Sequence, residues 1–155
     1  MAAPARNFGF LLHDVARLLR KRFEQRARHL GLTRAQWQVL AHLAHNEGIQ
    51  QGALADLLEV EPITLARILD RLQAAGLIER RHHASDRRVW LLHLRPAAEP
   101  LLERMRRLGE RTRQEATAGL AEADRDRLID ILGAMKANLV AACERPVEPA
   151  EAEDV

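Results

Sequence analysis

Residues 61–94 read EPITLARILDRLQAAG (61–76) and LIERRHHASDRRVWLLHL (77–94), and this stretch decides the fold. Glu61 can cap the amino end of a helix, Pro62 suits its first position, and Gly76 suits the left-handed residue that ends it. Two short apolar runs then flank a charged turn at 82–88, as in a hairpin. We predict one helix followed by a basic β-hairpin, the order found in a winged helix-turn-helix.

The helix predicted within residues 61–76 has two faces. Its apolar residues follow the 3.6-residue period and form a stripe suited to a core: Leu65, Ile68, Leu69 and Leu72. Thr64, Arg67 and Arg71 are spaced by three and four and share another face. In a major groove, Arg can donate a bidentate pair to guanine and Thr can bond a base edge or a phosphate. The alternative is a solvated amphipathic helix with ordinary surface arginines.

The hairpin predicted after this helix carries cations near its tip. Arg87 and Arg88 lie there, and Asp86 is placed to hold one of the two guanidinium groups. An extended Arg can enter a narrow minor groove, where the negative potential is concentrated, or bind phosphate. A salt-bridged surface turn is the alternative. Helix and hairpin together, in this order, favour double-stranded DNA as the partner.

The composition is that of one globular domain. The chain has 155 residues, of which 47% are hydrophobic and 30% charged, enough for one core or a small core with long helices. No apolar run is long enough to span a membrane, and the first residues lack the apolar region of a signal peptide, so we expect a cytoplasmic protein. The single Cys143 excludes an intrachain disulfide and a Cys-rich zinc site.

Positive charge is concentrated away from the carboxyl terminus. Residues 144–155 hold five acids and one arginine, so the net charge of +2 divides into −4 for this tail and +6 for the rest. The tail also contains Pro146 and Pro149 and little apolar surface, which predicts disorder. This asymmetry favours a polyanionic partner.

The rest of the chain reads as helices. We predict a long helix over about 7–30 that Gly31 ends, and a short one over about 51–58. Thr33 and Gln36 form a capping-box pattern, with Leu32 and Trp37 as a hydrophobic staple, so another helix begins at Thr33 and runs to about His45.

Two further helices are expected after the hairpin. Pro96 opens a long one, and Asp124 caps a last one that Pro146 ends. The apolar stripes of the first and the last two helices have no partner in the compact region, so a homodimer is the economical solution. We therefore divide the chain by role into 1–32 and 96–143 for dimerisation, 33–95 for DNA binding and 144–155 as the acidic tail. The expected fold class is mainly α with a small β-wing.

The chain resembles a known family. Leu32–Thr33 to Trp37, LDRL at 69–72, GLI at 76–78 and DRR at 86–88 are similar to the MarR family of bacterial regulators, over about residues 7–143. Within it, ASDRR at 84–88 and AEPL at 98–101 look most like the SlyA branch. The resemblance implies a homodimer whose first, fifth and sixth helices interlock. It also implies regulation of nearby genes, more often by repression, from a pseudo-palindromic operator.

The resemblance further implies which residues act. Thr64, Arg67, Pro62 and Ile63 would meet the major groove, and Arg87 with Arg88 would serve the wing. Three more residues match positions that line an effector crevice for small aromatic or phenolic anions in SlyA-like proteins: Arg17, Arg20 and Trp37. The alternative is that Trp37 serves only the staple and that both arginines lie on a solvated or DNA-facing helix.

Other function classes have weaker support in the sequence. A phosphate-cradling glycine loop, a nucleophile with a recognisable base and a metal cluster are all missing, so we expect neither an enzyme nor a cofactor. His42 and His45 share a helix face but lack a third metal ligand. Two alternatives stay open: a winged helix used only for protein contacts, and a redox sensor acting through Cys143.

Overall fold

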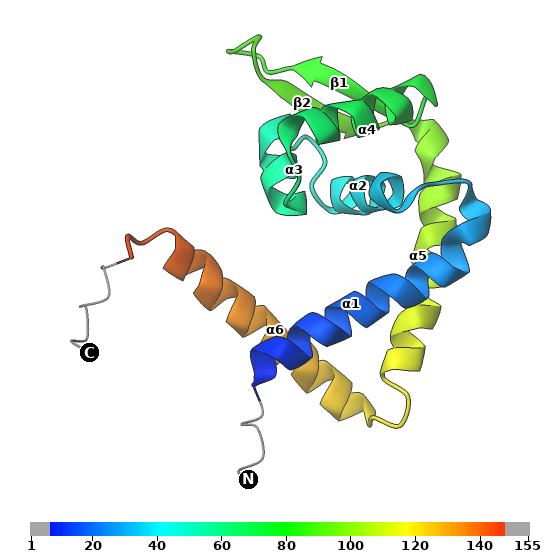
Figure 1. Ribbon diagram of the computed structural model, residues 1–155, viewed down its shortest axis with the longest axis vertical. Helices are drawn as coiled ribbons and strands as arrows, with labels where there is room; N and C mark the ends of the chain where they lie inside the picture. The colour runs from blue at the N-terminus through cyan, green and yellow to red at the C-terminus, as the bar shows by residue number, and fades with distance from the viewer. Residues whose placement is uncertain (1–6, 148–155) are drawn as a thin grey trace, which may run out of the picture. The chain divides into compact units, whose positions relative to one another are not determined.

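The computed structural model describes residues 7–147 and is mostly helical, with one two-stranded antiparallel sheet in that range (Figure 1). The elements are α1 (Phe8–Ala27), η1 (Arg28–Leu30), α2 (Arg34–His45), α3 (Gln51–Leu58), α4 (Pro62–Ala74), β1 (Ile78–His82), β2 (Trp90–Leu94), η2 (Pro96–Ala98), α5 (Glu99–Ala116) and α6 (Glu122–Cys143). The predicted class, mainly α with a small β-wing, is confirmed.

Local chemistry sets the first helix boundaries. The Asn7 side chain accepts a hydrogen bond from the Gly9 N–H at the start of α1, and Gly31 takes the left-handed conformation after η1, with φ of 71°. At the start of α2, the Thr33 side chain accepts from the Gln36 N–H while the Gln36 side chain accepts from the Thr33 N–H. The predicted capping box is therefore confirmed, and both orphan donors are satisfied.

A single apolar core joins α2, α3, α4, the sheet and the first half of α5. Its largest fully buried side chains are Leu40, Leu43, Leu54, Leu65, Leu69, Leu72, Ile78, Leu92 and Val39. The stripe predicted for α4 thus faces the core through Leu65, Leu69 and Leu72, while Ile68 is half-buried beside them. Packing of this stripe fixes which face of α4 stays in solvent.

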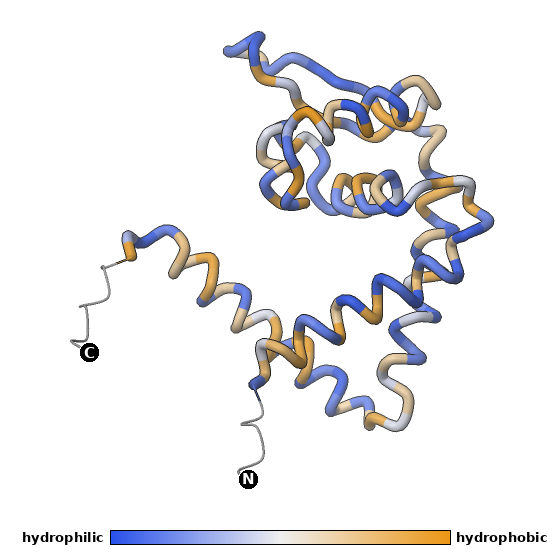
Figure 2. The backbone as a smooth tube through the Cα atoms, in the orientation of Figure 1, coloured by the Kyte–Doolittle hydropathy of each residue, from blue (hydrophilic) through white to orange (hydrophobic). Residues whose placement is uncertain are grey.

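The hairpin is anchored on both edges of β2. β1 and β2 pair from Ile78 with Leu94 to His82 with Trp90. On its other edge, Leu92 donates to the carbonyl of Ile49 at 3.0 Å and accepts from the N–H of Gly48 at 2.8 Å. The segment before α3 therefore holds the base of the hairpin, whose first strand and tip are largely hydrophilic (Figure 2).

Three helix starts differ from the predictions. The Glu61 side chain makes no capping hydrogen bond, although Pro62 does occupy the first turn of α4. Pro96 opens a 3₁₀ turn rather than α5 itself. Ala121, not Asp124, is the N-cap of α6, and Asp124 lies in its first turn, where its charge favours the positive end of the helix dipole.

The chain divides into two compact units with the boundary between Ala116 and Thr117. The division by role into 1–32, 33–95, 96–143 and 144–155 stays a prediction. From residue 148 onward, the predicted acidic tail lies outside the described residues. None of the helices between residues 7 and 147 combines the length and apolarity that a bilayer crossing needs.

Candidate nucleic-acid interface

The solvent face of α4 carries the residues predicted to read DNA. Pro62, Ile63, Thr64, Arg67 and Arg71 are all exposed, and Ile63 keeps 63% of its surface in solvent. Within residues 7–147, the guanidinium groups of Arg67 and Arg71 make no hydrogen bond or ion pair. Since the opposite face of α4 is buried in the core, this helix is rigid and its arginines are available to a ligand.

The hairpin tip presents one restrained and one unrestrained guanidinium. Arg88 Nε and Nη2 donate to the two carboxylate oxygens of Asp86 at 3.1 and 3.2 Å, and the Arg88 N–H also donates to Asp86 at 3.0 Å. These bonds from Arg88 lower the pKa of the Asp86 carboxyl. The Arg88 side chain is still 91% exposed. Arg87 is exposed and has no ion pair within the described chain.

An aromatic contact stiffens the hairpin just below this tip. The rings of His82 and Trp90 stack across the two strands, with centroids 3.8 Å apart and planes at 26°. They occupy the last register pair before the turn. Cross-strand contacts of this kind stabilise the hairpin where it leaves the core. The two strands are therefore held together up to the turn.

Arg80 is a residue that the sequence analysis missed. Its side chain is only 14% exposed and forms an ion pair with Asp70 at 2.8 Å. Its other bonds go to the side chains of Gln51 and Gln73 and to the carbonyl oxygen of Ala66. One guanidinium thus ties β1 to α3 and α4. The available signal was strand alternation, because position 80 shares the inward face with Ile78.

The three residues proposed for an effector site have different environments. Arg17 pairs with Asp14 at 3.2 Å on the exposed side of α1. Arg20 is half-buried. Trp37 is buried in the core, 4.5 Å from the ring of Phe23. None of the three is among the residues that line the two cavities described below, and their joint role stays a prediction.

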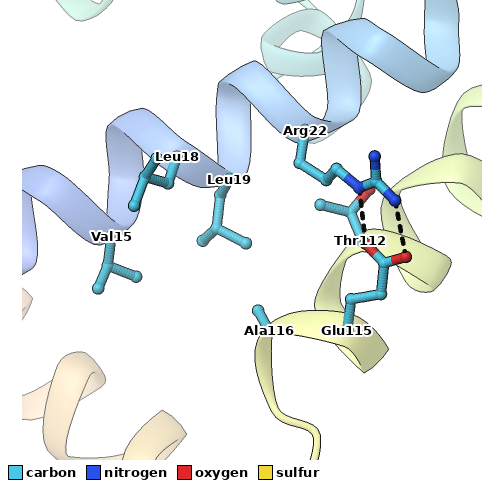
Figure 3. Close-up of a pocket in the computed structure, with 7 residues that line it drawn as sticks. All are labelled: Val15, Leu18, Leu19, Arg22, Thr112, Glu115 and Ala116. Carbon is cyan, nitrogen blue, oxygen red and sulfur yellow. Dashed lines mark hydrogen bonds and ion pairs between the residues drawn. The ribbon is translucent and has the colours of Figure 1, made fainter.

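An apolar cavity of about 310 Å³ opens between α1 and α5 (Figure 3). Its walls are Val15, Leu18, Leu19, Thr112 and Ala116, and at one end Arg22 reaches across to Glu115. Arg22 donates to both carboxylate oxygens of Glu115, at 2.8 and 3.0 Å, and Arg26 Nη2 also pairs with one of them, Oε1. The hydrogen bonds from Arg22 and then Arg26 lower the pKa of Glu115 to about 2.

The described residues offer few groupings of side chains that could bind a metal ion. Between residues 7 and 147, no group of three His, Cys, Asp or Glu side chains is placed to hold a metal ion. Burial, and then the neighbouring His45, lower the pKa of His42 from its ordinary value. His45 instead contacts the carbonyl oxygen of Ala41 at 2.9 Å.

Known proteins share both the sequence and the architecture. A profile of the MarR family matches residues 30–89. The solved structure of a transcriptional regulator, PA3341, is 36% identical with a TM-score of 0.75, and the match covers 87% of this chain and 99% of that one. This chain belongs to the MarR family. The part that the family profile matches runs from the end of η1 through α4 to the hairpin turn.

Two other relatives extend the comparison within the MarR family. The regulator SlyA is 28% identical with a TM-score of 0.72, over 89% of this chain and 97% of that one. BpsR from Bordetella bronchiseptica is 26% identical with a TM-score of 0.68, over 88% and 97%. The DNA binding of BpsR is regulated by 6-hydroxynicotinic acid. The MarR-family chain described above therefore has the fold of a transcriptional regulator.

Proposed function

We propose that this chain is a cytoplasmic, homodimeric, sequence-specific DNA-binding regulator that binds a pseudo-palindromic operator and acts as a repressor. The observation that carries the proposal is the solvent face of α4. Thr64, Arg67 and Arg71 are exposed there, and their side chains make no hydrogen bond or ion pair within residues 7–147. The exposed Arg87 and Arg88 follow on the hairpin. MarR-family regulators are non-enzymatic transcription factors, which agrees with this use of the fold.

In this proposal α4 lies in the major groove. Arg67 donates to guanine, Arg71 and Thr64 bond a base edge or a phosphate, and Pro62 with Ile63 contact the groove through apolar atoms. The hairpin reaches an adjacent minor groove with Arg87 and Arg88. Asp86 holds the Arg88 guanidinium before DNA arrives, so less side-chain entropy is lost on binding.

A homodimer is supported by apolar surface that the single chain leaves in solvent. The long exposed side chains include Phe8, Phe10 and Leu11 on α1 and Ile129, Leu139 and Val140 on α6. No residue of α6 is buried, although the helix runs for 22 residues. Large apolar side chains exposed in such number along a helix favour an interaction site on each of the two helices. The cavity between α1 and α5 also exposes mainly apolar side chains, because the two charged residues at its rim, Arg22 and Glu115, pair with each other.

A small aromatic or phenolic anion is proposed as effector, at the crevice to which Arg17, Arg20 and Trp37 belong by their match to the SlyA-like branch. Membership of that branch is itself part of the proposal and rests on residues 84–88 and 98–101. An effector of this kind would act by favouring a dimer geometry in which the two α4 helices no longer match the half-site spacing.

The deciding experiment is a salt titration of binding to a random duplex, followed by fluorescence anisotropy. Binding through several arginine–phosphate contacts predicts a slope of log K against log salt of about −0.9 per neutralised phosphate. A flat titration, or no binding, would refute the proposal and favour a winged helix used for protein contacts. Selection of bound fragments from the source genome then gives the operator and its half-site spacing.

Redox sensing through Cys143 is the second alternative, and the structure gives it one observation. Cys143 is a free, exposed thiol at the last residue of α6. An operator affinity that changes after peroxide treatment of the wild type, and does not change in Cys143→Ser, would establish redox control. The same affinity before and after oxidation assigns regulation to a small-molecule effector instead.

A further inference from the structure

A second cavity, of about 160 Å³, lies between η1, which follows α1, and α5. It is lined by His29 from η1 and by Arg104, Arg107, Leu108 and Arg111 from α5. The α5 residues are spaced by three, one and three, which puts them on one side of a helix facing the α1 side. Four of the five lining side chains are therefore cationic or can become so.

Little negative charge is available to neutralise this cavity. Arg107 pairs with Glu103 at 3.1 Å. Arg104 and Arg111 make no ion pair within residues 7–147. Glu115, one turn further along α5, already serves Arg22 and Arg26. Like charges three and four residues apart on a helix repel one another, so an anion bound among them would relieve a repulsion that the free protein retains.

Arginines of α1 also crowd the α1–α5 seam, the line along which α1 and α5 pack against each other. Arg26 donates to Glu115, yet its Nε–H is buried and has no hydrogen-bond partner in the described chain. Two guanidinium groups thus share one carboxylate there. The α1–α5 seam carries more donors than acceptors over its length, which is the condition for holding an oxyanion from outside the chain.

The size and the donor type select the ligand class. A pocket for a drug-sized ligand measures roughly 300–1,000 Å³, so this cavity is too small for one. At about 30 Å³ for each water molecule in the liquid, it has the room of a few waters, which suits one tetrahedral oxyanion. The guanidinium group of Arg can donate two parallel hydrogen bonds to phosphate oxygens. The charge of three arginines is also balanced better by a dianion, such as phosphate, than by the single charge of a carboxylate ligand.

The cavity lies apart from the surfaces proposed for DNA. Within residues 7–116, α2 lies between α4 and α1, and the hairpin extends from the α4 side (Figure 1). None of the residues that line the cavity belongs to α4 or to the hairpin.

We propose that the cavity formed by His29, Arg104, Arg107, Leu108 and Arg111 binds a phosphoryl group, either as free phosphate or as the end of a small phosphorylated compound. The bound group contacts both η1 and α5 and so stabilises the packing of these two elements against each other. This site shares no residue with the proposed effector crevice of Arg17, Arg20 and Trp37, and it does not depend on whether the chain binds DNA.

The test uses the full chain without DNA. Inorganic phosphate and pyrophosphate are titrated in by isothermal calorimetry at low ionic strength, and the binding of phosphate is followed independently by ³¹P line broadening. We expect saturable binding of one anion per chain that weakens as salt is added, because these charges are near the surface. Each of Arg104→Gln and Arg111→Gln is expected to weaken binding about tenfold, the loss of one charge-assisted contact.

Arg113→Gln is the matched control, because Arg113 lies on the other side of α5 and pairs with Glu110 at 2.7 Å. It should leave phosphate affinity unchanged, and circular dichroism checks that all variants keep their helices. Tighter binding of pyrophosphate than of phosphate assigns the site to a phosphorylated compound, and equal binding assigns it to free phosphate. Lack of saturable binding of both probes, equal losses in the Arg113 control, or displacement of phosphate by random duplex DNA would overturn the proposal.

Discussion

Arg80 shows how one side chain can hold the DNA-binding surface together. Its guanidinium is largely withdrawn from water and satisfied by two glutamine side chains, Asp70 and a helix carbonyl. The acceptors lie on α3 and α4, while the Arg itself is in β1. In the proposed complex, the positions of α4 and the hairpin relative to each other would decide which base steps are contacted, so we expect Arg80 to affect recognition without touching DNA.

We expect Arg80→Met to lower the free energy of unfolding by about 1–3 kcal/mol, because it leaves the Ala66 carbonyl and nearby acceptors without their donor while keeping most of the volume. Urea unfolding at neutral pH measures this. The control is Arg81→Met at the next position, whose Arg is exposed and pairs only with Glu79, and which should change stability by less than about 1 kcal/mol. Equal losses in both variants would contradict a special role for Arg80.

Replacing Arg67 and replacing Arg87 are expected to change DNA binding in different ways. Arg67→Ala removes a proposed bidentate contact to a base, so binding to the operator should weaken by about 1–3 kcal/mol and preference at one position should relax. Arg87→Ala removes a proposed phosphate or groove contact, so all sequences should weaken together and the salt slope should fall by about 1. Anisotropy with operator and random duplexes distinguishes the two. Equal loss on both duplexes for Arg67→Ala would remove its base-reading role.

At the scale of the element, one acidic residue of α5 forms ion pairs with two arginines of α1 where the two helices cross. Glu115 binds Arg22 and Arg26, and its pKa falls to about 2 from an ordinary 4.5. A lowered folded-state pKa means that the charged carboxylate favours the folded state. Its contribution is complete above about pH 4.5 and is lost as the pH falls toward 2.

Glu115→Gln should therefore unfold at a lower urea concentration than the wild type at neutral pH, and the difference should shrink as the pH falls from about 4.5 to 2. Glu110→Gln is the control. Its carboxylate pairs with Arg113 inside α5 at 2.7 Å and also has a lowered pKa, but it joins no second helix. A larger loss for Glu110→Gln than for Glu115→Gln would mean that the interhelical bridge contributes nothing special.

Elements whose ends depend on local chemistry were predicted well from the sequence. The capping box of Thr33, the left-handed glycines 31 and 76 and the apolar stripe of α4 are all as expected. What the sequence did not reveal depends on contacts across long separations. Arg22 meets Glu115 only because α1 crosses α5, and Arg80 finds its partners only once β1 lies on α4.

The failed cap predictions have a different cause, which is local to each helix start. Glu61 and Asp124 are chemically able to cap, but Pro62 already removes one orphan donor of α4, and α6 begins one residue after Ala121. The DNA-contact residues were chosen by helical spacing and fall on the solvent face of α4. Their contacts with DNA stay a prediction, since spacing identifies a face but not its ligand.

At the scale of the whole molecule, the proposed function needs two copies of the chain. One α4 reads only a few base pairs, and a pair of them related by a two-fold axis can meet half-sites about 34 Å apart. The exposed apolar residues of α1 and α6 give such a pair its contact surface. Since stable interfaces are built around buried apolar side chains, losing one of them should act on association before it acts on the fold.

Ile129→Lys tests this directly. Ile129 is 68% exposed in the single chain, so replacing it should have little effect on the folded protomer itself. In a symmetric dimer the residue is buried twice, at about 1.5–3 kcal/mol for each copy, so dimerisation should weaken by at least a hundredfold, on the order of 3 kcal/mol or more. Sedimentation equilibrium measures the dimer constant, and operator affinity should fall with it. Arg127→Gln, an exposed polar change on the same helix, should leave both unchanged. A dimer constant that Ile129→Lys does not alter would place the interface away from this part of α6.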